Sequence, residues 1–169
     1  MKELIQLIDK LIDARVIKNY AVFGAVAQMR YTEAVVTLDA DILIAIDNES
    51  IAVLSPIYKF CEERGYLPEG EAIRVGAWPV QFIPAFDKLS EAAMDNAVVA
   101  DMDGLNVRVV RADYLAVMAL SVGRAKDRMR ILALLEAEAI TESDIEELAT
   151  KYGLDDKWST FKERFLDEN

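Results

Sequence analysis

The sequence predicts an α+β fold in which a short mixed sheet is flanked by helices and followed by a C-terminal helical bundle. Through about residue 111, short β-branched and aliphatic runs alternate with amphipathic helical patterns, and beyond it only helical periodicity remains. A chain of 169 residues with 53% apolar content can bury one sizeable core. We therefore expect a core domain over residues 1–111 and a helical subdomain over residues 112–169.

Each expected element of the first part has its own signal. Apolar residues at spacings of three and four predict an amphipathic helix over residues 2–14. A strand over residues 20–24 follows, and Gly24 with the small residues after it permits a tight turn into a short helix that ends near residues 29–31. The elements expected next are a strand over 39–46 that "DNES" ends, a helix over 51–64, paired strands over 71–76 and 78–86, a helix over 88–97 and a strand pair ending at 110.

Four helices are expected in the last third of the chain. Their approximate ranges are 112–121, 125–139, 142–152 and 156–166. The segments "TESD" and "GLDD" are expected to supply the breaks and N-caps between them.

Charge and composition exclude several classes of protein. The net charge is −11, and residues 136–169 hold 11 acidic against 4 basic residues, so broad non-specific binding to nucleic acid is not expected. No long apolar run or signal peptide is visible, which predicts a cytoplasmic protein that does not enter a membrane. Without histidine, the usual zinc sites and histidine-based triads are absent, and the single cysteine, Cys61, is expected to be a core or boundary thiol.

Asp39 and Asp41 are unusual residues for an otherwise apolar strand. Residues two apart in a strand share a face, so both carboxylates are expected to project together while Leu38, Ala40 and Ile42 face the other way. Like charges in a partly buried site persist when a cation lies between them, and Mg²⁺ prefers such oxygen ligands. Alternatively, both residues simply end a loop at the solvent edge of the strand.

The segment around this pair resembles the nucleotidyltransferase superfamily related to DNA polymerase β. In that signature a Gly followed by Gly or Ser precedes an Asp-x-Asp strand, and here Gly24-Ala25 precedes Asp39-Ala40-Asp41 by thirteen residues. More closely, residues 23–44 look like the short bacterial proteins grouped with the AbiEii/AbiGii abortive-infection toxins. The segment "GRAKDRMRILALLE", residues 123–136, resembles the Arg-x-Lys-Asp segment of their C-terminal helices.

The resemblance implies a minimal nucleotidyltransferase fold and roles for particular residues. Backbone N–H groups at Gly24 and Ala25 are expected to contact a triphosphate. Asp39 and Asp41 are expected to hold Mg²⁺. Within residues 124–127, Arg124 and Lys126 are expected to bind the nucleotide, with Lys126 also catalytic and Asp127 orienting one of them. The alternative for this helix is a solvated face, because Arg124, Asp127 and Arg128 stand at spacings of three and four.

Two departures from the signature keep a second hypothesis open. Ala25 replaces the usual Gly or Ser, and Gln81 stands where a third carboxylate is often supplied, with Glu91 as a conceivable substitute. The leading expectation is Mg²⁺-dependent transfer of a nucleoside monophosphate from an NTP to a hydroxyl on RNA, protein or a small molecule. The resemblance implies a toxin–antitoxin or phage-defence role with a cognate partner. The alternative is a catalytically degenerate nucleotide-binding or antitoxin-like partner protein.

Overall fold

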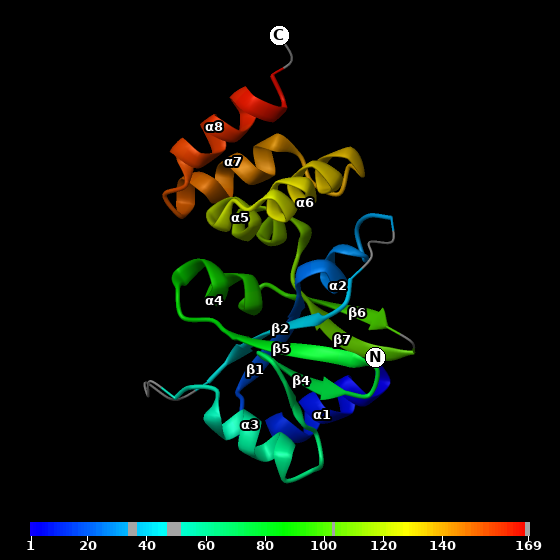
Figure 1. The fold of residues 1–169 in the computed structure, drawn as a ribbon. Helices are drawn as coiled ribbons and strands as arrows, with labels where there is room; N and C mark the ends of the chain where they lie inside the picture. Colours follow the sequence, from blue (N-terminus) through cyan, green and yellow to red (C-terminus); the bar gives the residue numbers. More distant parts are fainter. Residues whose placement is uncertain (34–36, 47–51, 103, 168–169) are drawn as a thin grey trace.

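A seven-stranded sheet lies between helices on both faces in the computed structural model, which describes residues 1–33, 37–46, 52–102 and 104–167 (Figure 1). The strands are β1 (Asn19–Phe23), β2 (Ala40–Ala45), β3 (Pro68–Glu69), β4 (Ala72–Val75), β5 (Trp78–Pro84), β6 (Val98–Met102) and β7 (Leu105–Val109). The helices are α1 (Lys2–Asp13), α2 (Gly24–Gln28), α3 (Ser55–Glu62), α4 (Lys88–Asp95), α5 (Ala112–Val122), α6 (Ala125–Glu136), α7 (Glu142–Lys151) and α8 (Asp155–Phe165).

The sheet is mixed, as the sequence predicts. Its strand order is β3-β4-β5-β2-β1-β7-β6. The central strand β2 runs parallel to β5 and antiparallel to β1, and β1 in turn runs parallel to β7. Antiparallel hairpins complete both sides of the sheet, β4 with β5 and β6 with β7. The strand that carries Asp41, and that Asp39 directly precedes, therefore lies near the middle of the sheet, where neighbours on both sides fix its register.

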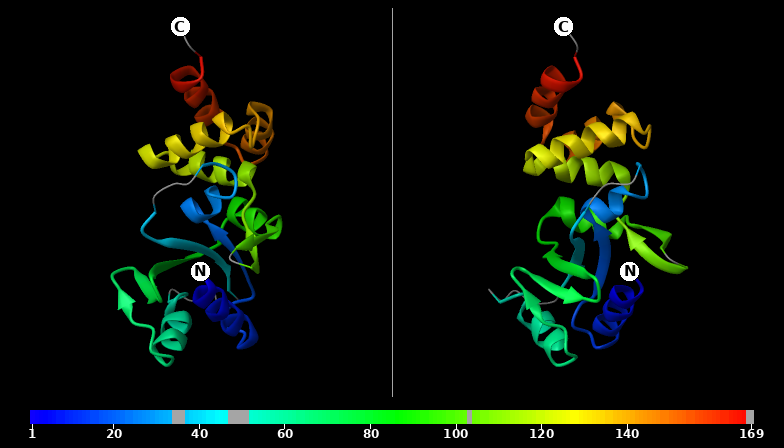
Figure 2. Two further views of the ribbon diagram at one scale, coloured as in Figure 1. Left: turned by 90° about the vertical axis from the view of Figure 1, so that its right-hand side faces the viewer. Right: turned by 45° about the vertical axis from the view of Figure 1, so that its right-hand side comes forward.

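Helices α1 and α3 cover one face of the sheet, and α4 with the C-terminal helices lies on the other (Figures 1 and 2). Most of the apolar stripe of α1 is buried, with Leu7, Ile8 and Leu11 inaccessible to solvent, which confirms the predicted amphipathic helix. In β2, Ala40 and Ile42 are buried as expected, but Leu38 precedes the strand and is 83% exposed. Leu38 therefore does not share the buried environment of Ala40 and Ile42, because the strand begins only at residue 40.

Several predicted boundaries shift for local reasons. Helix α3 begins at Ser55 instead of residue 51, because Pro56 favours the first turn of a helix. Residue 51 and the "DNES" segment lie outside the described residues. Helix α6 ends at Glu136 and not at residue 139, because Glu138 has a positive φ of 53°, which an α-helix does not accommodate. The two-residue strand β3 was not predicted, since so short an exposed strand carries no periodic signal.

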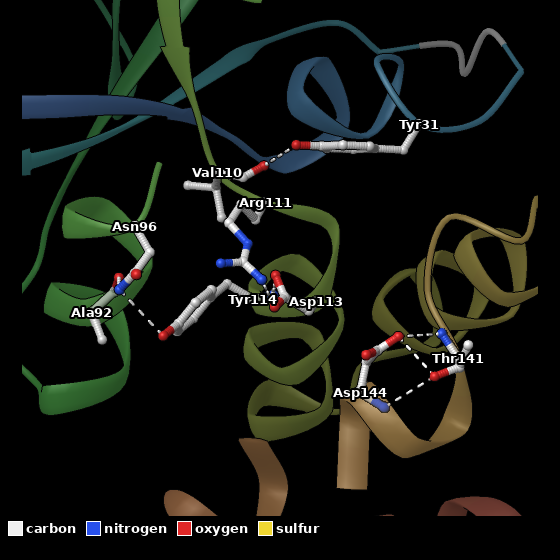
Figure 3. A network of polar contacts seen from close by, with 9 residues as sticks. All are labelled: Tyr31, Ala92, Asn96, Val110, Arg111, Asp113, Tyr114, Thr141 and Asp144. Atoms are coloured by element: carbon white, nitrogen blue, oxygen red, sulfur yellow. Dashed lines mark hydrogen bonds and ion pairs between the residues drawn. The ribbon is translucent and has the colours of Figure 1, made fainter. Parts of the chain in front are cut away.

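The C-terminal helices are joined to the sheet by polar contacts at the start of α5 (Figure 3). Tyr31, which follows α2, donates its hydroxyl proton to the carbonyl oxygen of Val110 over 3.1 Å. Asn96, at the end of α4, contacts the hydroxyl of Tyr114 in α5 at 3.4 Å. These contacts hold the first C-terminal helix against the core, and the division at residues 111/112 stays a prediction.

Of the two N-caps expected between the C-terminal helices, the one at "TESD" forms and the one at "GLDD" does not. Thr141 and Asp144 make a reciprocal capping box at the start of α7, visible at the lower right of Figure 3. Helix α8, by contrast, has Leu154 at its N-cap position and no side-chain cap. The "GLDD" segment breaks the chain at Gly153, whose φ is +69°, but the expectation of a capping side chain there is wrong.

Two composition-based expectations can be compared with the described residues. None of the helices in the described segments is both long enough and apolar enough to cross a bilayer. Cys61 is buried in the core, and burial raises the pKa of its thiol to about 11, so the thiol stays protonated at neutral pH. The structure thus confirms a core thiol.

Candidate active site

The turn from β1 into α2 packs directly against the Asp41 carboxylate. Gly24 has a φ of +62°, a conformation that residues with a Cβ rarely adopt. A Cβ atom at this position would lie 2.0 Å from Oδ2 of Asp41. A glycine is therefore required twice over, by the backbone conformation and by the closeness of the carboxylate.

The sheet register places Asp41 between two neighbouring strands. Its partners are Phe23 in β1 and Gln81 in β5, so the side chains of Asp41 and Gln81 share a face of the sheet. Asp39 lies just before β2. The Thr37 hydroxyl lies 3.0 Å from its carbonyl oxygen and 3.2 Å from its Oδ1, and the Gln81 amide nitrogen lies 3.5 Å from its Oδ2. The structure therefore brings Asp39 and Asp41 together, as the two-residue spacing predicts, and the pairing of β2 with β5 adds Gln81 beside them.

The charges around Asp41 act in opposite directions. Burial raises the pKa of Asp41, and the negative charge of Asp39 raises it further. Three cations at the start of α6 lower it in turn: Lys126, Arg130 and Arg124. The carboxylate is thus destabilised by its surroundings within the sheet and stabilised by positive charge from a helix more than 80 residues further along the chain.

Asp127 organises the cationic end of α6. It is 1% exposed and accepts hydrogen bonds from the backbone N–H of Arg124 at 3.1 Å and from its Nε at 2.7 Å. A buried carboxylate satisfied in this way orients the guanidinium, which is the role the resemblance implies for Asp127. Lys126 is exposed beside it. Arg128, expected on the same face as Arg124, instead donates to the carbonyl oxygen of Gly123 at 2.7 Å and lines a separate hollow against α8.

Sequence reasoning missed two residues that join the walls of this site. Arg130 in α6 donates from Nε to Oε1 of Gln28 in α2 over 3.1 Å, and its Nη1 lies 3.7 Å from Oδ1 of Asp127. Gln28 is 5% exposed, and burial lowers the pKa of Arg130. The sequence held one signal for this contact: Gln28 lies in the run of small apolar residues that follows Gly24. A polar side chain buried in such a run requires a hydrogen-bond partner.

The donor set of the site suits a hard divalent cation. Asp39 and Asp41 offer carboxylate oxygens, and rotation of the Gln81 amide would present its carbonyl oxygen on the same face. Among the described residues, no group of three acidic, cysteine or histidine side chains is arranged to hold a metal. Glu91 is exposed on α4 and does not join the pair, so the expectation that it replaces a third carboxylate is wrong. The residues present fit Mg²⁺ bound by two carboxylates, with its other ligands coming from phosphate or water.

Comparison with known proteins identifies the fold. No family model and no curated protein matches the sequence. An antigenic nucleotidyltransferase-like protein from Paracoccidioides brasiliensis superimposes with a TM-score of 0.55 at 11% sequence identity, covering 92% of this chain and 90% of that chain. The antibiotic-resistance factor ANT(2″)-Ia superimposes with a TM-score of 0.53 at 13% identity, covering 95% and 94% of the two chains. The chain therefore has the nucleotidyltransferase fold predicted from its sequence.

Proposed function

We propose that the protein transfers a nucleoside monophosphate from an NTP to a hydroxyl group in a reaction that requires Mg²⁺. The observation that carries the proposal is the convergence on Asp41 of the Gly24 turn, the second carboxylate of Asp39 and the cations of α6. A carboxylate pair beside a cationic wall can bind both a divalent ion and the polyphosphate that the ion accompanies.

Each residue of the site has a distinct part in the proposed reaction. The hydroxyl oxygen forms a bond to the α-phosphorus, the bond from that phosphorus to the bridging oxygen breaks, pyrophosphate leaves, and the hydroxyl proton passes to a site carboxylate. Arg124 and Lys126 stabilise the negative charge that builds up on the phosphate oxygens. Mg²⁺, held by Asp39 and Asp41, would supply charge neutralisation at the phosphates. Backbone N–H groups at Gly24 and Ala25 orient the triphosphate.

The proposal also covers the acceptor of the nucleotide and the biological role of the reaction. The Arg124-x-Lys126-Asp127 segment supports a place among the short bacterial proteins related to the AbiEii/AbiGii toxins, and with it a cytoplasmic toxin–antitoxin or phage-defence role with a cognate partner. The acceptor is a hydroxyl on RNA, protein or a small molecule. The net charge of −11 favours an RNA acceptor presented at one end over a long nucleic acid bound along its backbone.

Calorimetric titration with ATP, GTP, CTP and UTP, each with and without Mg²⁺, tests the binding step. We expect at least one nucleotide to bind, and to bind more tightly with Mg²⁺, because a cation relieves the repulsion between Asp39 and Asp41. Lys59→Ala, on α3 at the opposite face of the sheet, is the control and should bind like the parent. Absence of binding by all four nucleotides would remove the basis of the proposal.

Gln81 and Ala25 favour a second candidate, a nucleotide-binding protein without transferase activity that acts as an antitoxin-like partner. Gln81 occupies the strand position beside Asp41 and carries no charge, so it cannot act as a base there. Release of pyrophosphate in the presence of RNA or a cellular protein fraction separates the two candidates. Tight Mg²⁺-dependent binding without any pyrophosphate would favour the second.

A further inference from the structure

A hollow of about 300 Å³ lies between helices α5, α6 and α8. None of the residues proposed above to bind metal or nucleotide is among those that line it. Its floor is apolar, since Leu120 of α5, Ile131 of α6 and Phe161 of α8 line it and are all buried. Helix α8, its outer wall, is the helix furthest from the sheet (Figures 1 and 2).

Helix α8 lines the hollow with a single face. Lys157, Thr160, Phe161 and Arg164 follow one another at spacings of three and four, so their side chains lie along one side of the helix. The ring of Phe165, which also lines the hollow and is 43% exposed, has its centre 5.0 Å from that of Phe161. This wall therefore combines two aromatic rings with two cations.

The charge at the hollow has the opposite sign to that of the whole chain. Arg128, Lys157 and Arg164 line it together with one carboxylate, Asp156, so three positive charges stand against one negative charge. The net charge of the chain is −11, and two of the 4 basic residues within residues 136–169 are at this hollow. A local positive potential above an apolar floor favours an anion that carries an apolar body.

The cations at the hollow are held in place and keep the capacity to donate. Arg128 donates from Nη1 to the carbonyl oxygen of Gly123 at 2.7 Å, and its guanidinium lies 5.9 Å from the centre of the Phe165 ring. Lys157 donates to the carbonyl oxygen of Ser121. Because a guanidinium has five N–H donors and an ammonium has three, both groups can still donate to a bound anion.

We propose that this hollow binds a small organic anion with an aromatic body and one acidic group. The body packs on Phe161 and Phe165, and the acidic group accepts hydrogen bonds from Arg128 and Arg164. This inference goes beyond the proposed function and does not depend on it.

The size of the hollow favours a small molecule over a protein partner. Eleven residues line it, whereas a stable protein–protein interface uses about 20–30 residues on each side. Its volume of about 300 Å³ lies at the lower end of the range for small-molecule sites, roughly 300–1,000 Å³. An acid built on two fused aromatic rings is therefore a suitable probe.

Displacement of the fluorescent aromatic anion anilinonaphthalene sulfonate tests the inference on the full chain. The parent should bind the dye with a rise in fluorescence, and naphthoate should displace it. Naphthamide has the same rings without the charge and should compete at least about tenfold more weakly. Arg164→Gln should weaken naphthoate binding roughly threefold, because a partly solvated ion pair is lost. Lys151→Gln removes the same charge from α7, outside the hollow, and should bind naphthoate like the parent.

A second pair of variants tests the position of the site. Thr160→Phe adds a ring to the lining of the hollow, leaves its charges unchanged and should lose the dye binding that naphthoate displaces. Ser159→Phe adds the same ring at the preceding position of α8, which does not line the hollow, and should bind naphthoate like the parent. Both positions are exposed, so neither variant disturbs the core.

Three results would overturn the inference: equal effects of the two variants in either pair, competition by naphthamide as strong as that by naphthoate, or no displacement of dye from the parent by naphthoate. The last result would assign this face to solvent or to a protein partner. None of them bears on the proposed function, which the nucleotide titrations test separately.

Discussion

Replacing Gly24 with alanine is expected to disable the aspartate pair while the fold survives. The backbone at Gly24 has a φ of +62°, and holding an L-residue in this left-handed region costs about 1–2 kcal/mol. The added Cβ would lie 2.0 Å from Oδ2 of Asp41. Since an ordinary contact between carbon and oxygen is about 3.3 Å, the carboxylate must retreat by roughly 1.3 Å. Mg²⁺ holds its ligands within about 0.2 Å of ideal distances, so a displacement of this size removes Asp41 from the ligand set.

Gly70 offers a matched control for the backbone cost. Its φ is +63°, and a Cβ built there would meet nothing within 4 Å. Gly24→Ala and Gly70→Ala should therefore both lose about 1–2 kcal/mol in urea denaturation with EDTA. Only Gly24→Ala should also lose the rise in melting temperature that Mg²⁺–ATP gives the parent. If Gly24→Ala responds to Mg²⁺–ATP as the parent does, or Gly70→Ala fails to respond, the packing of Gly24 against Asp41 does not serve metal binding.

Three further predictions follow from single side chains. Lys126→Ala should weaken NTP binding about tenfold in calorimetry without changing the melting temperature, because an exposed lysine contributes charge and little packing; unchanged affinity would mean that Arg124 binds the phosphates without Lys126. Thr141→Ala should cost about 1 kcal/mol in urea denaturation through loss of the α7 cap, and parent-like stability would contradict the role of that cap. In EDTA, the pKa of Asp41 is raised in the folded state, so the protonated carboxyl stabilises the fold at pH values below its unfolded-state pKa, and this contribution is lost as pH rises through the folded-state pKa. Between these two pKa values, the free energy of unfolding of Asp41→Asn should therefore fall less steeply with pH than that of the parent. Equal slopes for the two proteins would contradict this prediction.

The fold was largely predictable because most of its elements carry a local signal. Short stretches of sequence predict the apolar stripe of α1, the strand pair β4 and β5 around the Gly76 turn, and the boundaries of α5 and α7. The errors fall where local signals are weak or compete, as at the start of α3 and at the uncapped start of α8.

The candidate site was only partly predictable, for a different reason. The two-residue spacing of Asp39 and Asp41 predicts that they share a face. Arg130 and Gln28, by contrast, are 102 residues apart, and no local sequence pattern indicates that they are in contact. Likewise, the sequence shows that Gln81 lies in a strand, whereas its register beside Asp41 is set by sheet pairing. Pairings between distant elements depend on the tertiary fold, and the parts of the site that rest on them required the structure.

Melting curves of the parent, Asp39→Asn and Asp41→Asn, each in EDTA and in millimolar Mg²⁺, test most directly whether the aspartate pair is a cation site. In EDTA both variants should be as stable as the parent or more stable, because the substitution removes repulsion between like charges in a partly buried site. In Mg²⁺ the parent should gain stability and neither variant should. If both variants are destabilised in EDTA by about 1 kcal/mol and the parent ignores Mg²⁺, the aspartates are ordinary residues at the start of a strand, and only the fold assignment stands.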